Sequence, residues 1–308
     1  MKDRDMNILH LKYAIEIAKS GSINKASEIL RMGQPNLSRA IKELESSLGI
    51  TIFERSARGM VATPEGEEFL NYARNILRQI DEIKSLYNPG QRKIQRFSVS
   101  VPRSDYINRA FARFSCMLGP EAADVVFRET DAYDTIRSVV QGECQLGIIR
   151  YDSDEEYYFK ALLDERKMSC RPIFEFTFRL TFSKNSPLCS LDAVKREDLE
   201  SLIEIERIMS NLSDNVQTRK PTSYSGNRKI RSVGRTVRFE LLSENPETFA
   251  LLAPISRETL ERYDLVQRKF PEETRVYKDM LIYRSEYTLS PLDKAFISEL
   301  SKTQNESL

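Results

Sequence analysis

The sequence predicts an α+β multidomain fold, in which a small helical domain with a two-stranded hairpin is joined by a long helix to a larger α/β domain. Three observations predict this class. Apolar residues at helical spacing fill the first part of the chain, one unbroken heptad pattern follows, and strand and helix patterns alternate from residue 96 onward. With 308 residues the chain is long enough for two or three domains, because domains cluster near ~100–150 residues.

The composition is that of a soluble globular protein, with 40% hydrophobic and 30% charged residues. No apolar run is long enough to span a membrane, and the N-terminus lacks the apolar core of a signal peptide, so we expect a cytoplasmic chain with no membrane partner. Four scattered cysteines without a CxxC pair predict reduced thiols and no metal site. His10 is the only histidine, and no nucleotide-binding glycine motif occurs. We therefore predict no catalytic residues, no cofactor and no enzyme.

The first two predicted helices are short and close together in the sequence. Residues 7–19 predict the first, and its apolar face consists of Ile8, Leu11, Ile15 and Ala18. Ser22 is placed to cap the second helix, whose apolar face consists of Ile23, Ala26 and Leu30. The small side chains of Ala26 and Ser27 allow the helices to approach closely.

A third helix is predicted after Gly33 breaks the helical run, and Pro35 fits its first position. Its inward face consists of Leu37, Ile41, Leu44 and Leu48. Its outward side and flanks carry Pro35, Asn36, Ser38, Arg39, Lys42 and Ser46. In a helix-turn-helix, the second helix enters the DNA major groove by its N-terminal turn, where polar side chains read base edges and the helix end attracts phosphate. A capped helix that faces only solvent is the alternative.

Two short strand patterns follow within residues 49–62, separated by Arg58 and Gly59, and Thr63-Pro64 leads into the next helix. Two strands placed after a reading helix predict a wing. Residues 19–64 carry seven basic and four acidic side chains, so their net charge is only +3. Affinity for DNA would therefore come from individual side-chain contacts, and from two DNA-binding domains acting together, more than from a general basic surface.

Three blocks, "GSINKASEIL", "GQPNLSRAIKELESSLGITIFER" and "ATPEGEEFL", follow one another at the spacing of one protein family. The chain resembles a full-length LysR-type transcriptional regulator, and the N-terminal match covers about residues 6–87. The resemblance implies a winged helix-turn-helix domain (1–64), a linker and dimerisation helix (65–89) and an effector-binding domain (90–308). It also implies homodimers, or dimers of dimers (homotetramers), that bind double-stranded DNA at a promoter, respond to a small-molecule effector and act on RNA polymerase.

The resemblance assigns the DNA-facing positions. Contacts to the groove would fall to Gln34, Pro35, Ser38 and Arg39 of the reading helix. Contacts to phosphate or to the minor groove would fall to Arg55 and Arg58 of the wing. The polar neighbours Asn36 and Lys42 complete the predicted DNA-binding set.

The linker helix carries apolar residues at alternating spacings of four and three, which is a heptad seam. The seam consists of Phe69, Ala73, Ile76, Ile80, Ile83 and Tyr87. Polar residues occupy the other faces, as expected of a helix that projects from a small domain to dimerise. The alternative is that the seam packs on its own domain. "NPGQRK" (88–93) then predicts a hinge that ends the helix.

Beyond the hinge, strands alternate with helices, which predicts a parallel α/β sheet. The predicted strands span 96–101, 123–129, 146–151, 178–183, 202–207, 249–254 and 276–284. The predicted helices span 105–118, 132–142 and 290–302. By resemblance, this half forms two periplasmic-binding-protein-like lobes around an effector, with lobe I at about 90–165 and 270–308 and lobe II at about 166–269. Gln145 and Asn245-Pro246 depart from the family's usual residues, so the effector class does not transfer.

Ligands of open α/β sheets bind beyond the carboxyl ends of the strands, where loops and helix N-termini converge. Ser104 follows the first strand and can cap the next helix or contact an anion, and the family commonly has Ser or Thr near this position. Thr130 and Arg150 follow the next two strands at the same end. A satisfied cap or a surface position is the alternative for each. These three residues are the lobe I part of the predicted effector site.

A basic run supplies the lobe II part. Residues 217–239 hold seven basic side chains and no acid, and Arg235 or Arg231 would reach an anionic metabolite across the cleft. A solvated basic loop is the alternative.

Two function classes remain open. The first is a sequence-specific DNA-binding transcriptional regulator modulated by a small effector, for which an anion is one candidate class. The second is an α/β small-molecule-binding protein or enzyme without a transcriptional role. It is disfavoured because one histidine and scattered cysteines supply neither a nucleophile–base pair nor a metal cluster. Binding to DNA upstream of its own or a neighbouring gene would separate the two.

Overall fold

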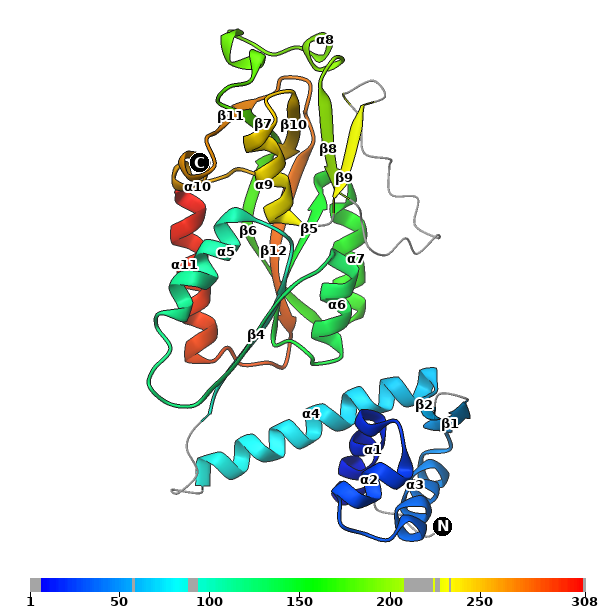
Figure 1. Cartoon of the computed structure of the whole chain (residues 1–308). Helices are drawn as coiled ribbons and strands as arrows, with labels where there is room; N and C mark the ends of the chain where they lie inside the picture. The colour runs from blue at the N-terminus through cyan, green and yellow to red at the C-terminus, as the bar shows by residue number, and fades with distance from the viewer. Residues whose placement is uncertain are drawn as a thin grey trace. The chain divides into compact units, whose positions relative to one another are not determined.

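The computed structural model describes residues 7–56, 59–87, 94–207, 224, 228–232 and 234–306. Its elements carry the labels of Figure 1. The helices of the N-terminal domain are α1 (Ile8–Ser20), α2 (Ile23–Ile29), α3 (Gln34–Leu48) and α4 (Pro64–Tyr87). Its strands, β1 (Phe53–Ser56) and β2 (Gly59–Ala62), pair antiparallel as the predicted wing.

One apolar core holds the N-terminal helices together. Its buried members are Leu11, Ala14, Ile15, Ile17, Ala26, Leu37, Ile41, Leu44, Ile52, Phe53, Leu70 and Ala73. Two residues expected on inward faces are exceptions, because Ile8 is 48% exposed and Leu48 is 37% exposed. Ile8 is the first residue of α1 and Leu48 the last of α3, so neither reaches the core.

The helix starts follow local sequence. The Ser22 hydroxyl accepts a hydrogen bond from the Lys25 N–H at 3.4 Å, which confirms the predicted cap of α2. Helix α3 begins at Gln34 with Gly33 as its cap residue, so Pro35 takes the second helical position and not the predicted first. Proline fits there equally well, because the N–H groups of the first turn have no acceptor within the helix.

Two glycines allow close approaches around the wing. Gly59 has φ +110°, and a Cβ at this position would lie 2.5 Å from the carbonyl oxygen of Gly21. At Gly66, in the first turn of α4, a Cβ would overlap the carbonyl oxygen of Ile52, which is fully buried. Both positions therefore need a residue without a side chain.

The C-terminal domain contains, among its described residues, two five-stranded sheets, one in each lobe. Lobe I has the order β4-β3-β5-β12-β6, formed by β3 (Gln95–Val101), β4 (Ala123–Glu129), β5 (Leu146–Asp152), β6 (Met168–Thr177) and β12 (Val276–Arg284). Lobe II has the order β11-β7-β10-β8-β9, formed by β7 (Arg179–Ser183), β8 (Ile203–Arg207), β9 (Lys229–Ser232), β10 (Thr248–Leu252) and β11 (Leu265–Lys269). The helices are α5 (Asp105–Ser115), α6 (Ala132–Val140), α7 (Glu156–Glu165), α8 (Arg196–Leu199), α9 (Arg235–Glu244), α10 (Arg257–Arg262) and α11 (Pro291–Asn305).

Both sheets are mixed, so the prediction of a purely parallel sheet is wrong. Strands β3 and β5 run parallel, but β12 runs antiparallel to β5 and β6. In lobe II, β8 is parallel to β9 and β10, and β7 is antiparallel to β10 and β11. The antiparallel strands are those that lead from one lobe to the other. A chain that leaves a lobe and returns at the same end must run in opposite directions in the two strands.

The crossing between the lobes lies later than the sequence predicts. Strand β6 pairs with β12 along its whole length, so lobe I extends to Thr177 and not to residue 165. The chain then passes through Phe178 into lobe II and returns to lobe I at Val276. The rings of Phe178 and Tyr277 stack with centroids 4.1 Å apart, so the two crossing segments lie side by side.

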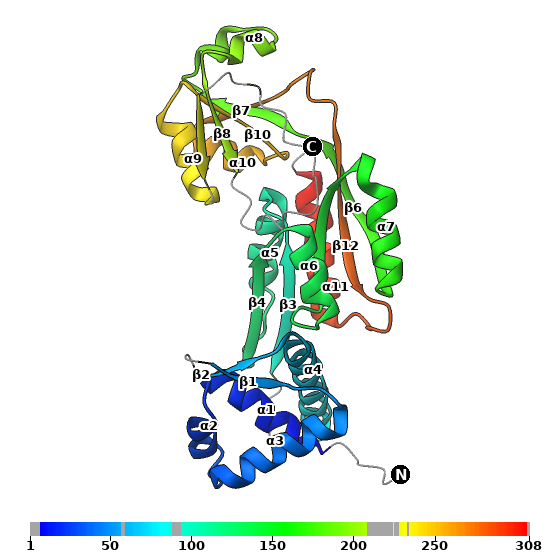
Figure 2. The same ribbon diagram turned by 90° about the vertical axis from the view of Figure 1, so that its right-hand side faces the viewer.

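Helices cover both faces of the lobe I sheet. Helices α5 and α11 pack together on one face, and α7 packs against β5 and β6 on the other (Figures 1 and 2). Phe114 and Phe296 meet edge to face between α5 and α11, with centroids 5.8 Å apart. This arrangement places the N-terminus of α5 at the carboxyl end of β3, where the sequence predicts an effector.

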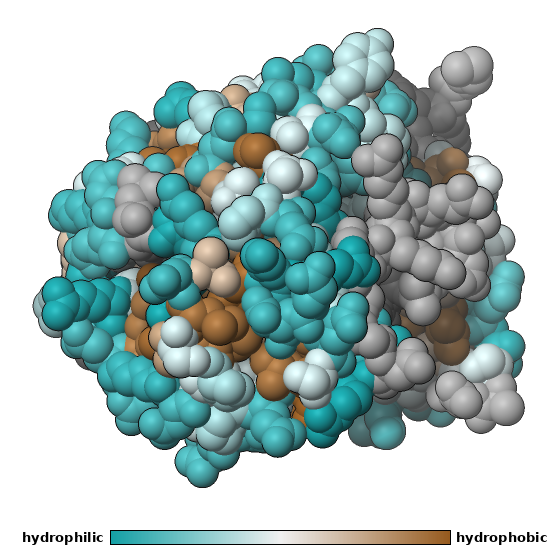
Figure 3. All heavy atoms as spheres, turned by 90° about the horizontal axis from the view of Figure 1, so that it is seen from above, coloured by the Kyte–Doolittle hydropathy of each residue, from teal (hydrophilic) through white to brown (hydrophobic). Residues whose placement is uncertain are grey.

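The surface is mostly polar, as the share of charged residues in the sequence predicts. The face seen from above in Figure 3 is mostly hydrophilic, with apolar side chains showing between polar ones. Within the ranges given above, no helix combines the length and the apolar character that a bilayer crossing requires.

Candidate nucleic-acid interface and effector region

Helix α3 presents one buried and one exposed face. Leu37, Ala40, Ile41 and Leu44 are buried. On the other side, Pro35, Asn36, Arg39 and Lys42 are exposed, and Gln34 and Ser38 are half-buried. The first turn of α3 carries no acid, so the positive end of its dipole is not opposed by a local carboxylate. The predicted reading residues thus share one surface, where a groove or a phosphate could meet them.

The wing adds a cation to this domain. Arg55 is exposed on β1, opposite Met60 of β2. Arg58 lies outside the described residues. Considering only described side chains, Arg39, Lys42 and Arg55 form no salt bridge with an acid of the chain. Their charges are therefore available to an outside anion.

The predicted dimer seam divides into two parts. Phe69, Ala73 and Ile76 pack against the core of their own domain, which is the alternative that the sequence left open. Further along α4, Ile80 is half-buried and Ile83 is 57% exposed. The Tyr87 side chain lies outside the described residues. Only the second half of the seam is therefore presented to a partner.

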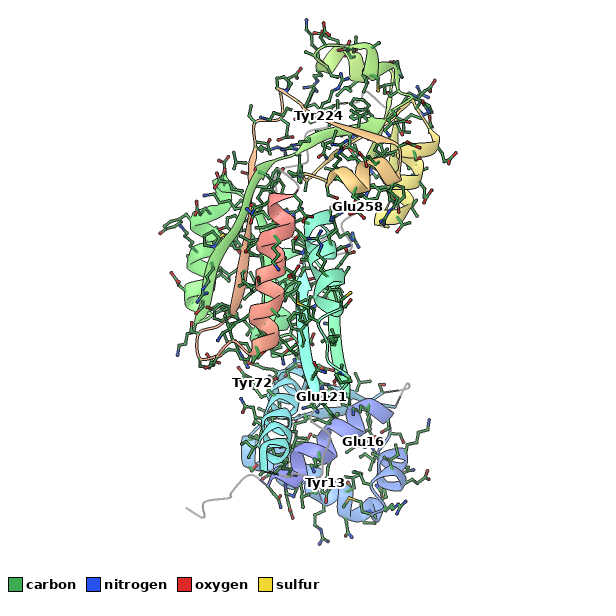
Figure 4. The ribbon with its side chains drawn as sticks, turned by 90° about the vertical axis from the view of Figure 1, so that its left-hand side faces the viewer. Tyr13, Glu16, Tyr72, Glu121, Tyr224 and Glu258 are labelled. Atoms are coloured by element: carbon green, nitrogen blue, oxygen red, sulfur yellow. The ribbon has the colours of Figure 1, made fainter. Side chains whose placement is uncertain are left out.

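An exposed tyrosine extends this apolar face. Tyr72, labelled in Figure 4, is 56% exposed on α4. Tyr72 and Ile83 are about three helical turns apart, so they fall on one stripe of the helix, whereas Ile76 between them packs on its own domain. A second helix could cover that stripe.

The predicted effector residues Ser104 and Thr130 lie at the carboxyl ends of their strands. Ser104 is the cap residue of α5, is buried, and makes no capping hydrogen bond with its side chain. The Thr130 hydroxyl is 2.6 Å from that of Ser100 and 2.7 Å from that of Thr135. The hydroxyls of Ser100 and Thr135 are themselves 3.1 Å apart. Thr130 therefore belongs to a closed group of three hydroxyls, and a ligand would have to add to or displace those bonds.

Arg150 has a structural partner that the sequence did not reveal. Its guanidinium donates to both carboxylate oxygens of Asp279, at 2.7 Å each. The Tyr106 hydroxyl donates to the same carboxylate at 2.7 Å. Asp279 has no exposed surface, and burial together with this carboxylate raises the pKa of Tyr106. The forked geometry is the strong form of such a pair, and it accounts for Arg150 without a ligand.

The basic run of lobe II is only partly described. Arg231 donates to Glu206 at 3.1 Å, and Lys229 donates to the same carboxylate at 2.5 Å. Burial opposes the charge of Glu206, but these hydrogen bonds outweigh it and lower its pKa. Arg235 is the first residue of α9, and its side chain lies outside the described residues. Of the two arginines considered for the ligand, Arg231 is thus already bonded within its lobe.

Two helices from different lobes meet at a polar contact that the sequence did not predict. Asp105, in the first turn of α5, is buried and accepts hydrogen bonds from the Ser256 N–H at 3.0 Å and the Thr259 hydroxyl at 2.9 Å. Arg109, one turn further along α5, donates to the Ser256 hydroxyl at 3.0 Å and to Glu258 at 2.7 Å. These five residues are called the α5–α10 contact below.

The α5–α10 contact continues to α11. Glu306, at the end of α11, accepts hydrogen bonds from Arg109 at 3.0 Å and from Arg113 at 2.7 Å. Figure 4 labels Glu258 on α10, beside the ends of α5 and α11. Each side of the α5–α10 contact had a signal in the sequence. On α5 it was an acid in the first helical turn, and on α10 it was the Ser256–Thr259 cap pattern. Asp105 and Ser256 are 151 positions apart, so no local sequence pattern could predict that they form a hydrogen bond.

The four cysteines are free thiols that differ in their exposure. Cys116 is exposed, Cys144 is buried, and Cys170 and Cys189 are half-buried free thiols. Burial raises the pKa of the Cys170 thiol to about 11, so little thiolate forms at neutral pH. In the part of the chain that the structure describes, no three His, Cys, Asp or Glu side chains are grouped to hold a metal ion.

Comparison with known proteins agrees with this geometry. The family described as "Bacterial regulatory helix-turn-helix protein, lysR family" matches residues 8–67. The chain is also 30% identical over 154 residues to the uncharacterized HTH-type transcriptional regulator YcgK of Bacillus subtilis (strain 168), which covers 49% of this chain and 47% of that one. The N-terminal domain belongs to the lysR family of bacterial regulatory helix-turn-helix proteins. The chain spans less than two thirds of the length of the curated relatives that it matches first.

Solved structures of LysR-type regulators share the fold. Full-length LysG from Corynebacterium glutamicum, with its effector Arg bound, aligns with a TM-score of 0.64 at 16% identity and covers 98% of this chain and 99% of that one. Full-length CbnR in complex with its target DNA aligns with a TM-score of 0.57 at 17% identity, covering 97% and 100%. The chain shares with these proteins the architecture of a winged helix-turn-helix followed by two mixed α/β lobes.

Proposed function

We propose that this chain is a transcriptional regulator that inserts the N-terminal turn of α3 into the major groove of DNA. The exposed polar face of α3 carries the proposal, because Arg39 and Lys42 stand solvated on a helix whose opposite side is buried in the core. Gln34, Pro35, Asn36 and Ser38 share the turn that would enter the groove. CbnR, which has this fold, has been solved with its target DNA.

The wing supplies the backbone contacts in this proposal. Arg55 and Arg58 would reach phosphate or the minor groove, and such contacts position a protein without carrying sequence information. The N-terminal region has a net charge of only +3, so a single reading head would bind weakly. Two heads in a dimer would double the number of phosphate contacts.

Dimerisation is proposed along the exposed apolar stripe of α4. Ile83 and Tyr72 are exposed apolar side chains on that helix, and a partner helix laid along them would remove both from water. From the family resemblance we also propose that dimers pair into tetramers and that the protein acts on RNA polymerase. The same resemblance supports a cytoplasmic location.

A small effector is proposed to regulate DNA binding from between the two lobes. LysG, with the same fold, has been solved with the effector Arg bound. Ser104 and Thr130 lie at the carboxyl ends of lobe I strands, where ligands of such sheets gather. Arg150 and Arg231 are held by Asp279 and Glu206, so an anionic effector would depend on Ser104, Thr130 and Arg235.

Selection of genomic DNA tests the proposal. Full-length protein is incubated with genomic fragments at a salt concentration that suppresses binding through phosphates alone. We expect a small set of fragments to be enriched, including one upstream of its own or a neighbouring gene. Recovery of all fragments in proportion to their abundance would overturn the function as a sequence-specific regulator and would favour an α/β ligand-binding protein.

A further inference from the structure

One glutamate joins the reading helix to the wing. The Glu45 carboxylate accepts hydrogen bonds from the Ile52 N–H at 2.7 Å and from the Phe53 N–H, at the start of β1, at 3.2 Å. The Glu45 backbone carbonyl accepts from the N–H groups of Gly49 at 2.8 Å and Ile50 at 3.3 Å. Four backbone donors between the end of α3 and the start of β1 are thus satisfied by one residue.

The same segment is tied to α4 by a different residue. The Thr63 N–H donates to the Ile52 carbonyl at 3.0 Å, and the Thr63 hydroxyl donates to the Thr51 carbonyl at 2.6 Å. Thr63 also caps α4 through the Gly66 N–H at 2.9 Å. Loss of the Glu45 carboxylate would therefore leave the wing attached to α4 while loosening its side-chain connection to α3.

Arg55 stands two residues beyond the Glu45 bonds. Each strand residue advances about 3.3 Å, so the position of the Phe53 N–H determines where the Arg55 side chain is presented. Hydrogen bonds to a carboxylate are shorter and stronger than those to a neutral acceptor. The carboxylate is half-buried, which protects these bonds from competition with water.

We propose that Glu45 is a positioning residue for DNA binding, because its carboxylate fixes the wing relative to α3 so that Arg55 meets the backbone while α3 occupies the groove. The proposal rests on the proposed function. It predicts that removal of this acidic side chain lowers the affinity for DNA. An acid in a DNA-binding domain normally repels phosphate, so its removal should strengthen binding. Removal of Glu45 should weaken binding instead.

The test is a double-mutant cycle on the full-length chain. Fluorescence anisotropy measures binding to a short labelled duplex of mixed sequence across a salt series, for wild type, Glu45→Ala, Arg55→Ala and the double variant. We expect either single variant to weaken binding several-fold and to lower the salt slope by about one, as for one lost phosphate contact. The double variant should bind no worse than either single variant, because both act through Arg55.

Two further variants separate positioning from charge and from stability. Glu43→Ala removes an exposed acid from the same helix and should leave affinity unchanged or raise it. Glu45→Gln keeps an oxygen acceptor and should restore most of the binding lost in Glu45→Ala. Thermal unfolding of each variant sets the measuring temperature below the onset of melting.

Three results would overturn the proposal while leaving the proposed function intact: tighter binding by Glu45→Ala, additive losses in the double variant, or no rescue by Glu45→Gln. Failure of the wild-type chain to bind any duplex would instead remove the proposed function itself.

Discussion

The two halves of the molecule use their arginines in opposite ways. On α3 and β1, and within the described residues, Arg39 and Arg55 are exposed and bonded to no acid. In the C-terminal domain, Arg150 is bonded to Asp279, and Arg109 is bonded to Glu258. The sequence suggested an anion-binding role for Arg150 as it did for Arg55, so residue type alone did not separate the two uses.

The difference follows from solvation. An exposed guanidinium loses little by staying hydrated, and it keeps its donors available to an outside phosphate. A guanidinium beside a buried carboxylate must stay paired, because either charge left alone in that site is costly. Whether an arginine serves a partner or the fold therefore depends on what lies opposite it.

Removal of the buried carboxylate should have the largest effect. Asp279→Ala leaves both Arg150 and Tyr106 without their shared acceptor, and we expect the free energy of unfolding of the C-terminal domain to fall by about 3–5 kcal/mol. Denaturant titration followed by tyrosine fluorescence measures it. Glu261→Ala, which removes the acid of an exposed pair with Arg257, is the control and should change nothing measurable. Equal losses in the two variants would break the comparison.

Removal of a groove contact should affect specific binding. Gln34→Ala should weaken binding to an enriched genomic fragment by about 1–3 kcal/mol and leave binding to mixed-sequence DNA nearly unchanged. The free energy of unfolding should stay the same, because Gln34 is the first residue of α3 and does not belong to its buried face. Gln304→Ala, the same substitution on α11, is the control. Equal losses on both kinds of DNA would remove Gln34 from the reading surface.

Removal of Asp105 tests whether the C-terminal domain uses its charges to hold the lobes. Asp105→Ala leaves the Ser256 N–H and the Thr259 hydroxyl without this acceptor, which should cost about 1–3 kcal/mol. We expect a broader distribution of distances between spin labels placed on the two lobes. Glu258→Ala, at the exposed rim of the same contact, should broaden it less. An unchanged distribution in Asp105→Ala would mean that the crossing strands alone set the lobe orientation.

The smallest effect on the folded chain is expected from Ile83→Asp. Because Ile83 is 57% exposed, a carboxylate there should leave the stability of a single chain unchanged. In a dimer paired along α4 it would be buried against an apolar partner, so sedimentation should show dissociation. Ile76→Asp is the contrasting variant, because Ile76 packs on its own domain and its replacement should unfold that domain. Unchanged sedimentation of Ile83→Asp would place the dimer interface elsewhere.

Local rules in the sequence determined the N-terminal domain in most detail. The spacing of Leu37, Ile41 and Leu44 predicted the buried face of α3, and Ser22 predicted the start of α2. Both signals act within a few residues, where helix period and capping decide the outcome. The same spacing predicted the polar face of α3, because side chains that do not point into the core are exposed to solvent.

Only the tertiary structure decided the division of the α4 seam and the partner of Arg150. The heptad spacing is identical for Ile76 and Ile83, yet one meets its own core and the other meets solvent. Arg150 and Asp279 are 129 positions apart and become neighbours only because β12 returns from lobe II to lie beside β5. Periodicity fixes which way a side chain points along its own element, but the element that arrives opposite it is set by chain topology.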